Sequence, residues 1–184
     1  MKRLLLMLLA VLLASPAAAE KGFAVRELWF QKSASGYSLY ANLSAGPPQI
    51  LQQLMASGYT LQLIFELRFM RTRPWLPDEF LGDITWQPQL SYNALLNRYI
   101  FKVGNRIEEL DSLEQALARA GRLRAAPADD ERLAAIIQMP EVYLRAHYKL
   151  KVDDFPQPLQ VSLLTNDWPI ISGWQRFITE ERGP

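Results

Sequence analysis

The sequence predicts a mainly β fold: an antiparallel β-sandwich of about eight strands, with one short helix and an inserted pair of helices. Apolar and polar residues alternate with period two over most of the chain, as in strands buried on one face. At about residues 111–139 the pattern changes to the apolar spacing of amphipathic helices. A closed β-barrel is the alternative, because alternation alone does not distinguish two stacked sheets from one closed sheet.

The first half of the chain is expected to contain three strands and the short helix. We expect strands at residues 24–32, 37–43 and 60–70, and a helix at 49–57. Glycine and two prolines at 46–48 end the second strand, and Gly58 suits a left-handed helix cap. The third strand has the clearest alternation, carried by Leu61, Leu63, Phe65, Leu67 and Phe69.

The second half is expected to contain the remaining strands and the two inserted helices. Asp111 and Glu114 resemble a capping box at the start of the first inserted helix. Pro88 predicts an edge position or a bulge within its strand, because proline cannot donate a hydrogen bond to the sheet. The expected strands are 83–92, 98–104, 106–110, 142–152, 159–164 and 170–178, and the second inserted helix is 129–138.

The N-terminus has the pattern of a secretory signal peptide. Lys2 and Arg3 precede an apolar run at 4–14, and three alanines at 17–19 suit a signal peptidase. The run is shorter than the roughly 20 apolar residues that span a bilayer as a helix. We therefore expect cleavage after residue 19, a single β-rich domain at 20–184, and a periplasmic location in a Gram-negative bacterium.

Composition argues against several functional classes. The chain has 20 basic and 19 acidic residues, so its charge predicts no nucleic-acid partner. It has no cysteine and one histidine, which disfavours thiol nucleophiles and histidine-rich metal sites. It contains no glycine-rich phosphate loop and no serine nucleophile elbow. We expect no cofactor, no metal and no catalytic residue, and hence a protein that is not an enzyme.

The candidate binding site is the loop predicted at residues 71–82. Arginine and tryptophan are enriched at binding hot spots because they combine a large contact area with directed hydrogen bonds. In the alternative interpretation, the loop is only structural, its tryptophan plugs the end of the core, and its arginines pair with its acids. The residues proposed to contact a partner are Arg71, Arg73, Trp75, Asp78 and Glu79.

The single histidine, His147, lies in the strand predicted at 142–152. Alternation places it on the polar face with Arg145, Lys149 and Lys151, and no carboxylate of that strand neighbours it. We expect an exposed basic face that resists edge-to-edge aggregation. A site for an anionic group is the alternative.

The order of several short motifs resembles a family of secreted proteobacterial proteins, domain of unknown function 4390 (DUF4390). The motifs are Gly58 at a helix end, Arg71-x-Arg73-x-Trp75, Leu90-Ser91-Tyr92 with Leu95, Arg98-Tyr99, residues 156–159 and residues 168–174. Members are often encoded beside a membrane sensor kinase of the nitrogen-regulation type. The resemblance therefore implies an envelope location and a link to signalling, and it supplies no catalytic residues.

Three functions follow as hypotheses. The first is a non-enzymatic periplasmic binding or accessory module, with an envelope or inner-membrane protein as partner and no transmembrane helix after signal cleavage. The second is a carrier of a small apolar or lipid ligand, with the inserted helices as a lid. The third is a hydrolase, supported only by His147 and scattered acids.

Overall fold

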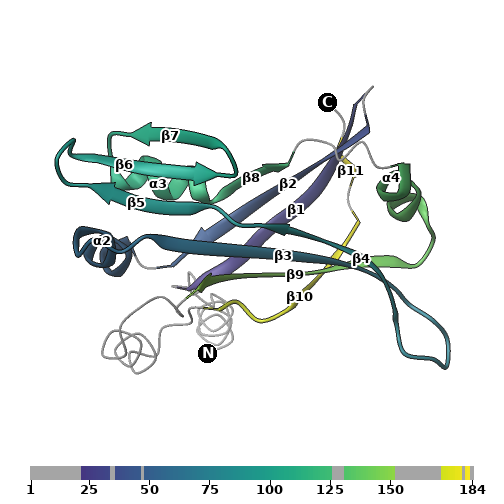
Figure 1. Ribbon diagram of the computed structural model, residues 1–184. Coiled ribbons are helices and arrows are strands. Elements are labelled where there is room, and N and C mark those ends of the chain that lie inside the picture. Colours follow the sequence, from purple (N-terminus) through teal and green to yellow (C-terminus); the bar gives the residue numbers. More distant parts are fainter. Residues whose placement is uncertain are drawn as a thin grey trace, which may run out of the picture.

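Two β-sheets packed face to face form the body of the molecule (Figure 1). The computed structural model describes residues 22–33, 36–46, 48–125, 131–151, 171–179 and 181–182. The described strands are β1 (Phe23–Ser33), β2 (Gly36–Ala45), β3 (Leu61–Arg71), β4 (Glu79–Trp86), β5 (Gln89–Asn93), β6 (Arg98–Val103), β7 (Arg106–Leu110), β8 (Arg122–Ala125), β9 (Val142–Lys151), β10 (Gln175–Ile178) and β11 (Glu181–Arg182). The described helices are α2 (Pro48–Ala56), α3 (Leu113–Ala120) and α4 (Glu131–Gln138).

The smaller sheet has the order β11-β1-β2-β8, and the larger has the order β10-β9-β3-β5-β6-β7 with β4 also paired to β3. Neighbouring strands are antiparallel, except for the short β11, which runs parallel to β1. The described strands remain in two separate sheets, so the sandwich is confirmed and the closed alternative is not. The expected strand at 159–164 lies outside the described residues.

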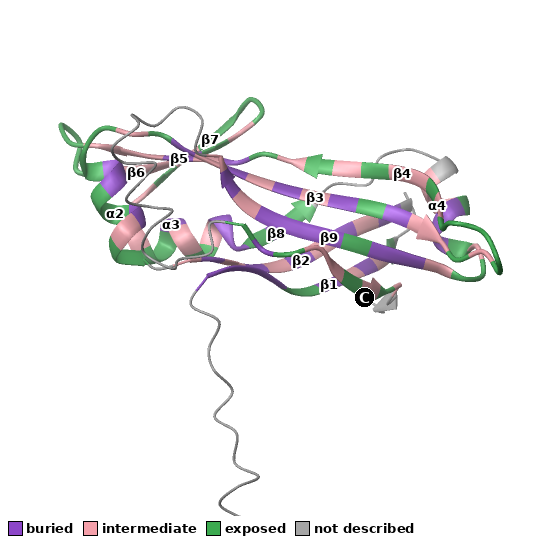
Figure 2. Ribbon diagram, turned by 90° about the horizontal axis from the view of Figure 1, so that it is seen from below, coloured by how far each residue is buried: buried purple, intermediate pink, exposed green. Residues whose placement is uncertain are grey.

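The core lies between the two sheets, and many of the buried residues that Figure 2 marks in purple belong to β3 and β9. Every second residue of β3, from Leu61 to Phe69, is buried, as the alternation predicts. Phe69 meets Phe30 of the opposite sheet at a ring-centroid distance of 6.1 Å. Tyr148 of β9 meets Phe23 in the same way at 5.3 Å. Aromatic contacts across the sandwich therefore hold the sheets together.

The strand expected at 83–92 is divided into β4 and β5. Pro88 lies between them, and its carbonyl accepts a hydrogen bond from the Leu63 N–H at 2.9 Å. Both strands pair with the same side of β3, at opposite ends. The proline therefore divides the predicted strand in two, and both parts still run along β3. This division is one reason that the structure has more strands than the eight or so predicted.

Helix α2 ends at Gly58, as predicted. Gly58 has a φ of +88°, its N–H donates to Met55 O at 3.0 Å, and the Tyr59 N–H donates to Leu54 O at 3.1 Å. This is the pair of bonds that closes a Schellman motif. The left-handed backbone that it requires is readily adopted by glycine.

The predicted helical pair is wrong in one respect, because a strand separates the two helices. After α3 the chain forms β8, which pairs with β2 in the smaller sheet, and only then reaches α4. The first cap also differs from the prediction. Ser112, not Asp111, caps α3 by accepting a hydrogen bond from the Gln115 N–H at 3.2 Å.

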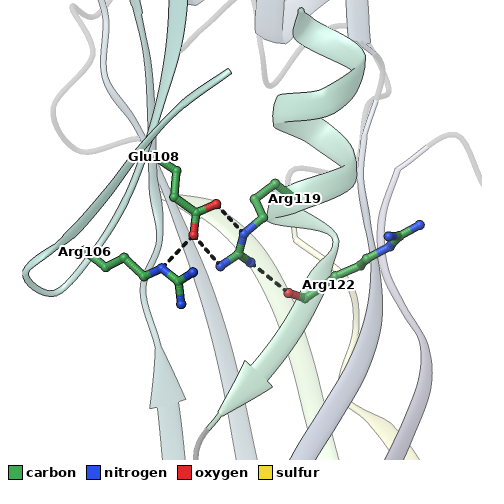
Figure 3. Close-up of polar contacts among 4 residues, drawn as sticks. All are labelled: Arg106, Glu108, Arg119 and Arg122. Atoms are coloured by element: carbon green, nitrogen blue, oxygen red, sulfur yellow. Dashed lines mark hydrogen bonds and ion pairs between the residues drawn. The ribbon is translucent and has the colours of Figure 1, made fainter. Parts of the chain in front are cut away.

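An ion-pair cluster fastens α3 to the β6–β7 hairpin (Figure 3). Both carboxylate oxygens of Glu108 accept hydrogen bonds from Arg119, at 2.8 and 3.0 Å, and Arg106 contacts the same carboxylate at 2.8 Å. The Arg119 guanidinium also lies 4.4 Å from the ring centroid of Phe101. This bidentate bond to Arg119 is the main reason that the pKa of Glu108 is lowered.

Candidate functional site

The predicted site residues lie on the β3–β4 hairpin, at one end of the sandwich (Figure 1). Antiparallel pairing places Arg71, the last residue of β3, opposite Glu79, the first of β4, and their side chains form an ion pair. The connection at 72–78 contains two prolines, which limit its conformational freedom. The chain therefore forms a hairpin that is closed at its base.

Hydrogen bonds hold the hairpin loop in place. Arg73 donates twice to the carbonyl of Pro77, at 3.1 and 2.9 Å. The Tyr143 hydroxyl on β9 donates to Asp78 at 2.5 Å, which is the main reason that the pKa of this tyrosine is raised. The N–H of Thr72 donates to a backbone carbonyl beside β9 at 3.1 Å. The loop is therefore tied both to itself and to the sheet.

At the tip, Trp75 is fully exposed and has a φ of +66°, in the left-handed region that bulky residues rarely adopt. Leu76 and Phe80 beside it are also exposed. Trp75 does not plug the core, so that part of the structural interpretation is wrong. That interpretation also expected the arginines of the loop to pair with its acids, which holds for Arg71 and Glu79. Of the five predicted residues, Trp75 alone is directed wholly to solvent, and the other four take part in contacts within the protein.

A second group of side chains covers the outer face of the larger sheet, which we define as the side of β4, β3, β9 and β10 turned away from the smaller sheet. The strand registers place these side chains in parallel rows across the four strands. The apolar row consists of Phe80, Met70, Tyr143 and Ile178. The arginine row consists of Arg68, Arg145 and Arg176, with Asp83 beside Arg68 on β4.

Next to the arginine row, His147 lies against Glu66 and Trp174. Its Nε2 is 3.1 Å from a carboxylate oxygen of Glu66, without the geometry of a hydrogen bond. Its ring stacks on that of Trp174 at 4.0 Å between centroids. The expectation of an exposed histidine is therefore wrong, because His147 is only 7% exposed. The sequence prediction considered neighbours on its own strand, whereas Glu66 reaches it from β3.

Burial is the main cause of the lowered pKa of His147, which favours the neutral ring near pH 7. For Glu66 burial alone would raise the pKa, but Lys149 donates a hydrogen bond at 3.1 Å and adds positive charge beside it. These effects outweigh burial, so the pKa of Glu66 is lowered. Glu66 is therefore a carboxylate whose charge is balanced mainly by Lys149.

Aromatic rings support the arginine row. The guanidinium of Arg68 lies 4.4 Å from the ring centroid of Trp174, and that of Arg145 lies 5.5 Å from it. Arg176 lies 3.7 Å from the ring centroid of Tyr143. An open groove of about 360 Å³ adjoins this row, lined by Glu66, Arg68, Phe80 and Asp83. The groove itself carries two acids, whereas Arg145 and Arg176, farther along the row, can bind an anionic group beside the apolar row.

The described residues contain no group of three or more His, Asp or Glu side chains that could hold a metal ion. Within the same residues, no helix is both long enough and apolar enough to cross a membrane. The hairpin tip and the outer face present exposed apolar and arginine side chains.

Comparison with known proteins identifies a family. The family model described as "Domain of unknown function (DUF4390)" matches residues 20–178. Searches of curated proteins and of solved structures gave no match. The family model covers most of the chain and agrees with the resemblance of its motifs, and the chain therefore belongs to the DUF4390 family.

Proposed function

We propose that this protein is a non-enzymatic binding module of the bacterial periplasm, which presents the tip of the β3–β4 hairpin to a protein of the cell envelope. The observation that supports this function best is the complete exposure of Trp75 on a loop held by hydrogen bonds within itself and to β9. Burial of a tryptophan against a partner removes a large apolar area from water, which favours association.

The fixed shape of the loop strengthens this proposal. A flexible loop would lose conformational entropy on binding, at a cost of roughly 0.5–1.5 kcal/mol for each side chain that becomes ordered. Bonds from Arg73 and Tyr143 already order this loop in the free protein. The adjoining exposed side chains of Leu76 and Phe80 extend the apolar contact area around the tryptophan.

The location and the partner rest on the sequence. The signal-peptide pattern at residues 1–19 supports export, and the family resemblance makes a membrane sensor kinase the first partner to test.

In-cell photo-crosslinking tests this function. The mature chain is compared with a Trp75→Ala/Leu76→Ala variant and with a Leu95→Ala/Leu96→Ala control. The control removes two exposed apolar side chains from the β5–β6 hairpin instead. We expect one envelope protein to be recovered with wild type and control, and at least about tenfold less of it with the Trp75 variant. Equal recovery with all three folded proteins would place the contact elsewhere.

The two alternative functions have no specific support from the described geometry. The interior between β3, β9 and the opposite sheet is filled by large side chains such as Phe30, Phe65 and Tyr148, and the groove beside Arg68 opens on the outer face. Native mass spectrometry tests the carrier, and assays with ester, glycoside and peptide substrates test the hydrolase.

A further inference from the structure

The arginine row is unusual because three like charges occupy directly opposed positions on neighbouring strands. Arg145 of β9 faces Arg68 of β3 on one side and Arg176 of β10 on the other. Like charges in opposed cross-strand positions repel each other and destabilise a sheet. All three arginines are exposed, so the row lies open to solvent.

Among the described residues, no carboxylate lies within ion-pair distance of these three arginines. Arg176 donates a hydrogen bond of 3.4 Å to the hydroxyl of Thr72, which carries no charge. Elsewhere in the described structure, arginines such as Arg71, Arg98 and Arg119 are paired with acids. The guanidinium groups of the row instead lie over the rings of Trp174 and Tyr143, which orients them and leaves N–H donors available.

The apolar row runs beside the arginine row. Phe80 and Ile178, at its two ends, are 55% and 80% exposed. A ligand that covered both rows would need carboxylates along one side and apolar side chains along the other. The exposed hairpin tip continues this surface, since Phe80 follows Trp75 closely in the chain and lies at the start of β4.

We propose that the outer face binds an acidic, amphipathic segment of the protein partner, with carboxylates on the arginine row and apolar side chains on the apolar row. This inference rests on the proposed function, because it concerns the same partner: one part of the partner binds the hairpin tip, and the adjoining segment binds the outer face. Charge complementarity selects the ligand: a carboxylate accepts paired hydrogen bonds from a guanidinium and relieves the repulsion within the row.

A narrow segment fits this face better than a broad anionic surface. Strand spacing of about 4.8 Å places the three arginines along a line of about 10 Å. Glu66 flanks the line on one side, and Asp83 lies at its β4 end beside Arg68. These acids would repel the anionic headgroups of a membrane surface. A peptide, in contrast, can place its carboxylates at Arg145 and Arg176, away from Asp83.

The test uses a fluorescein-labelled peptide of about 12 residues in which Glu alternates with Leu and Ser, and a second peptide with Gln in place of Glu. Fluorescence anisotropy measures their binding to the mature chain, to Arg145→Glu and to a Lys102→Glu control. Lys102 is an exposed residue of β6 and undergoes the same change of charge sign. Its register through Gln89 to Gln62 places it on the same side of the sheet, but at the opposite end of β3 from the arginine row. We expect Arg145→Glu and the Gln peptide each to weaken binding at least about tenfold, and Lys102→Glu to leave it unchanged.

Arg145→Glu also tests the repulsion without any ligand. The substitution places a negative charge between Arg68 and Arg176, so we expect an increase in Tm of about 1–3 °C. A variant that is at least as stable as wild type but has lost peptide binding separates recognition from folding. Equal binding of both peptides, or of wild type and Arg145→Glu, would overturn the inference. Binding of phosphatidylglycerol vesicles without binding of the Glu peptide would overturn it as well.

Crosslinking with Arg145→Glu separates this inference from the proposed function. Loss of the partner with Trp75→Ala/Leu76→Ala but not with Arg145→Glu would reject the acidic segment and leave the hairpin contact intact. Loss with Arg145→Glu alone would reject the hairpin site.

Discussion

Arg119 and Arg145 each lie over an aromatic ring, but they differ in the charge beside them. This difference distinguishes a structural arginine from a candidate ligand-binding one. Arg119 lies over Phe101 and makes a bidentate bond to Glu108 (Figure 3). Arg145 lies over Trp174, and the described structure places arginines rather than acids opposite it. An arginine whose charge is satisfied within the fold stabilises that fold. One held in place without a counter-charge is available to an external anion.

The two hairpin tips show the same contrast for apolar residues. Leu95 on the β5–β6 hairpin is almost as exposed as Trp75 on the β3–β4 hairpin. The β5–β6 turn is closed by Asn93, whose side chain accepts hydrogen bonds from two backbone N–H groups. Exposure of one apolar residue is ordinary in soluble proteins. The β3–β4 tip differs because its exposed residues continue into an apolar row and an arginine row.

The largest expected effect on stability concerns the packing of α3 against β2, which positions Arg119 for its ion pair with Glu108. A Cβ atom at Gly121 would lie 2.6 Å from the carbonyl oxygen of Leu43, a backbone atom that cannot rotate away. We expect Gly121→Ala to lower the free energy of unfolding by about 3 kcal/mol, because overpacking forces α3 away from β2.

Denaturant unfolding measures this change, with Gly173→Ala as the control. A Cβ atom at Gly173 would meet nothing within 4 Å, so that variant should unfold as the wild type does. Equal stability of the two variants would show that α3 is not closely seated on β2.

The next effect compares the two arginines directly. We expect Arg119→Ala to cost about 2 kcal/mol of unfolding free energy, because Glu108 would lose its bidentate partner in a partly buried site. Arg145→Ala should cost nothing measurable or raise stability slightly, because it removes a positive charge that has two like-charged cross-strand neighbours. Urea unfolding of both variants checks this difference. Equal losses would contradict the distinction between a structural and a ligand-binding arginine.

The smallest effect is a difference in pH dependence between the two regions. The pKa of His147 is lowered by burial, so the unfolded chain takes up a proton more readily than the folded one. Stability should therefore decrease as the pH falls through about 6.5. The lowered pKa of Glu108 makes a contribution that is present above about 4.5 and is lost only as the pH falls below that value.

Urea titrations between about pH 8 and about pH 3.5 separate the two steps. His147→Gln should remove the first step and Glu108→Gln should reduce the second, while Glu66, whose pKa is also lowered, still contributes to it. A first step that persists in His147→Gln would assign it to another group.

Local patterns were sufficient to predict much of the fold. The alternation from Leu61 to Phe69 identified β3 and its buried side, and Gly58 identified the end of α2. Pro88 was expected to mark an edge position or a bulge within one strand, whereas in the structure it separates β4 from β5. The strand between α3 and α4 was missed, because Leu123 is the buried anchor of a four-residue element and so short a run shows no period.

The candidate site was predicted only in part. The hairpin loop was located from its arginines and tryptophan, yet the sequence did not show that Trp75 is exposed while Arg71 and Asp78 are bound within the protein. The arginine row was missed entirely. Arg68, Arg145 and Arg176 are far apart in the chain, and no local signal brings them together.

The sequence by itself determined the membership of the DUF4390 family, the longer strands such as β3 and β9, and which side of these strands is apolar, because these depend on neighbours in the chain. Tertiary structure alone decided that His147 is buried against Glu66 and Trp174, and that three arginines lie in one row. The physical reason is strand register. Alternation assigns a residue to a face, but pairing between distant strands decides which residues share that face as neighbours.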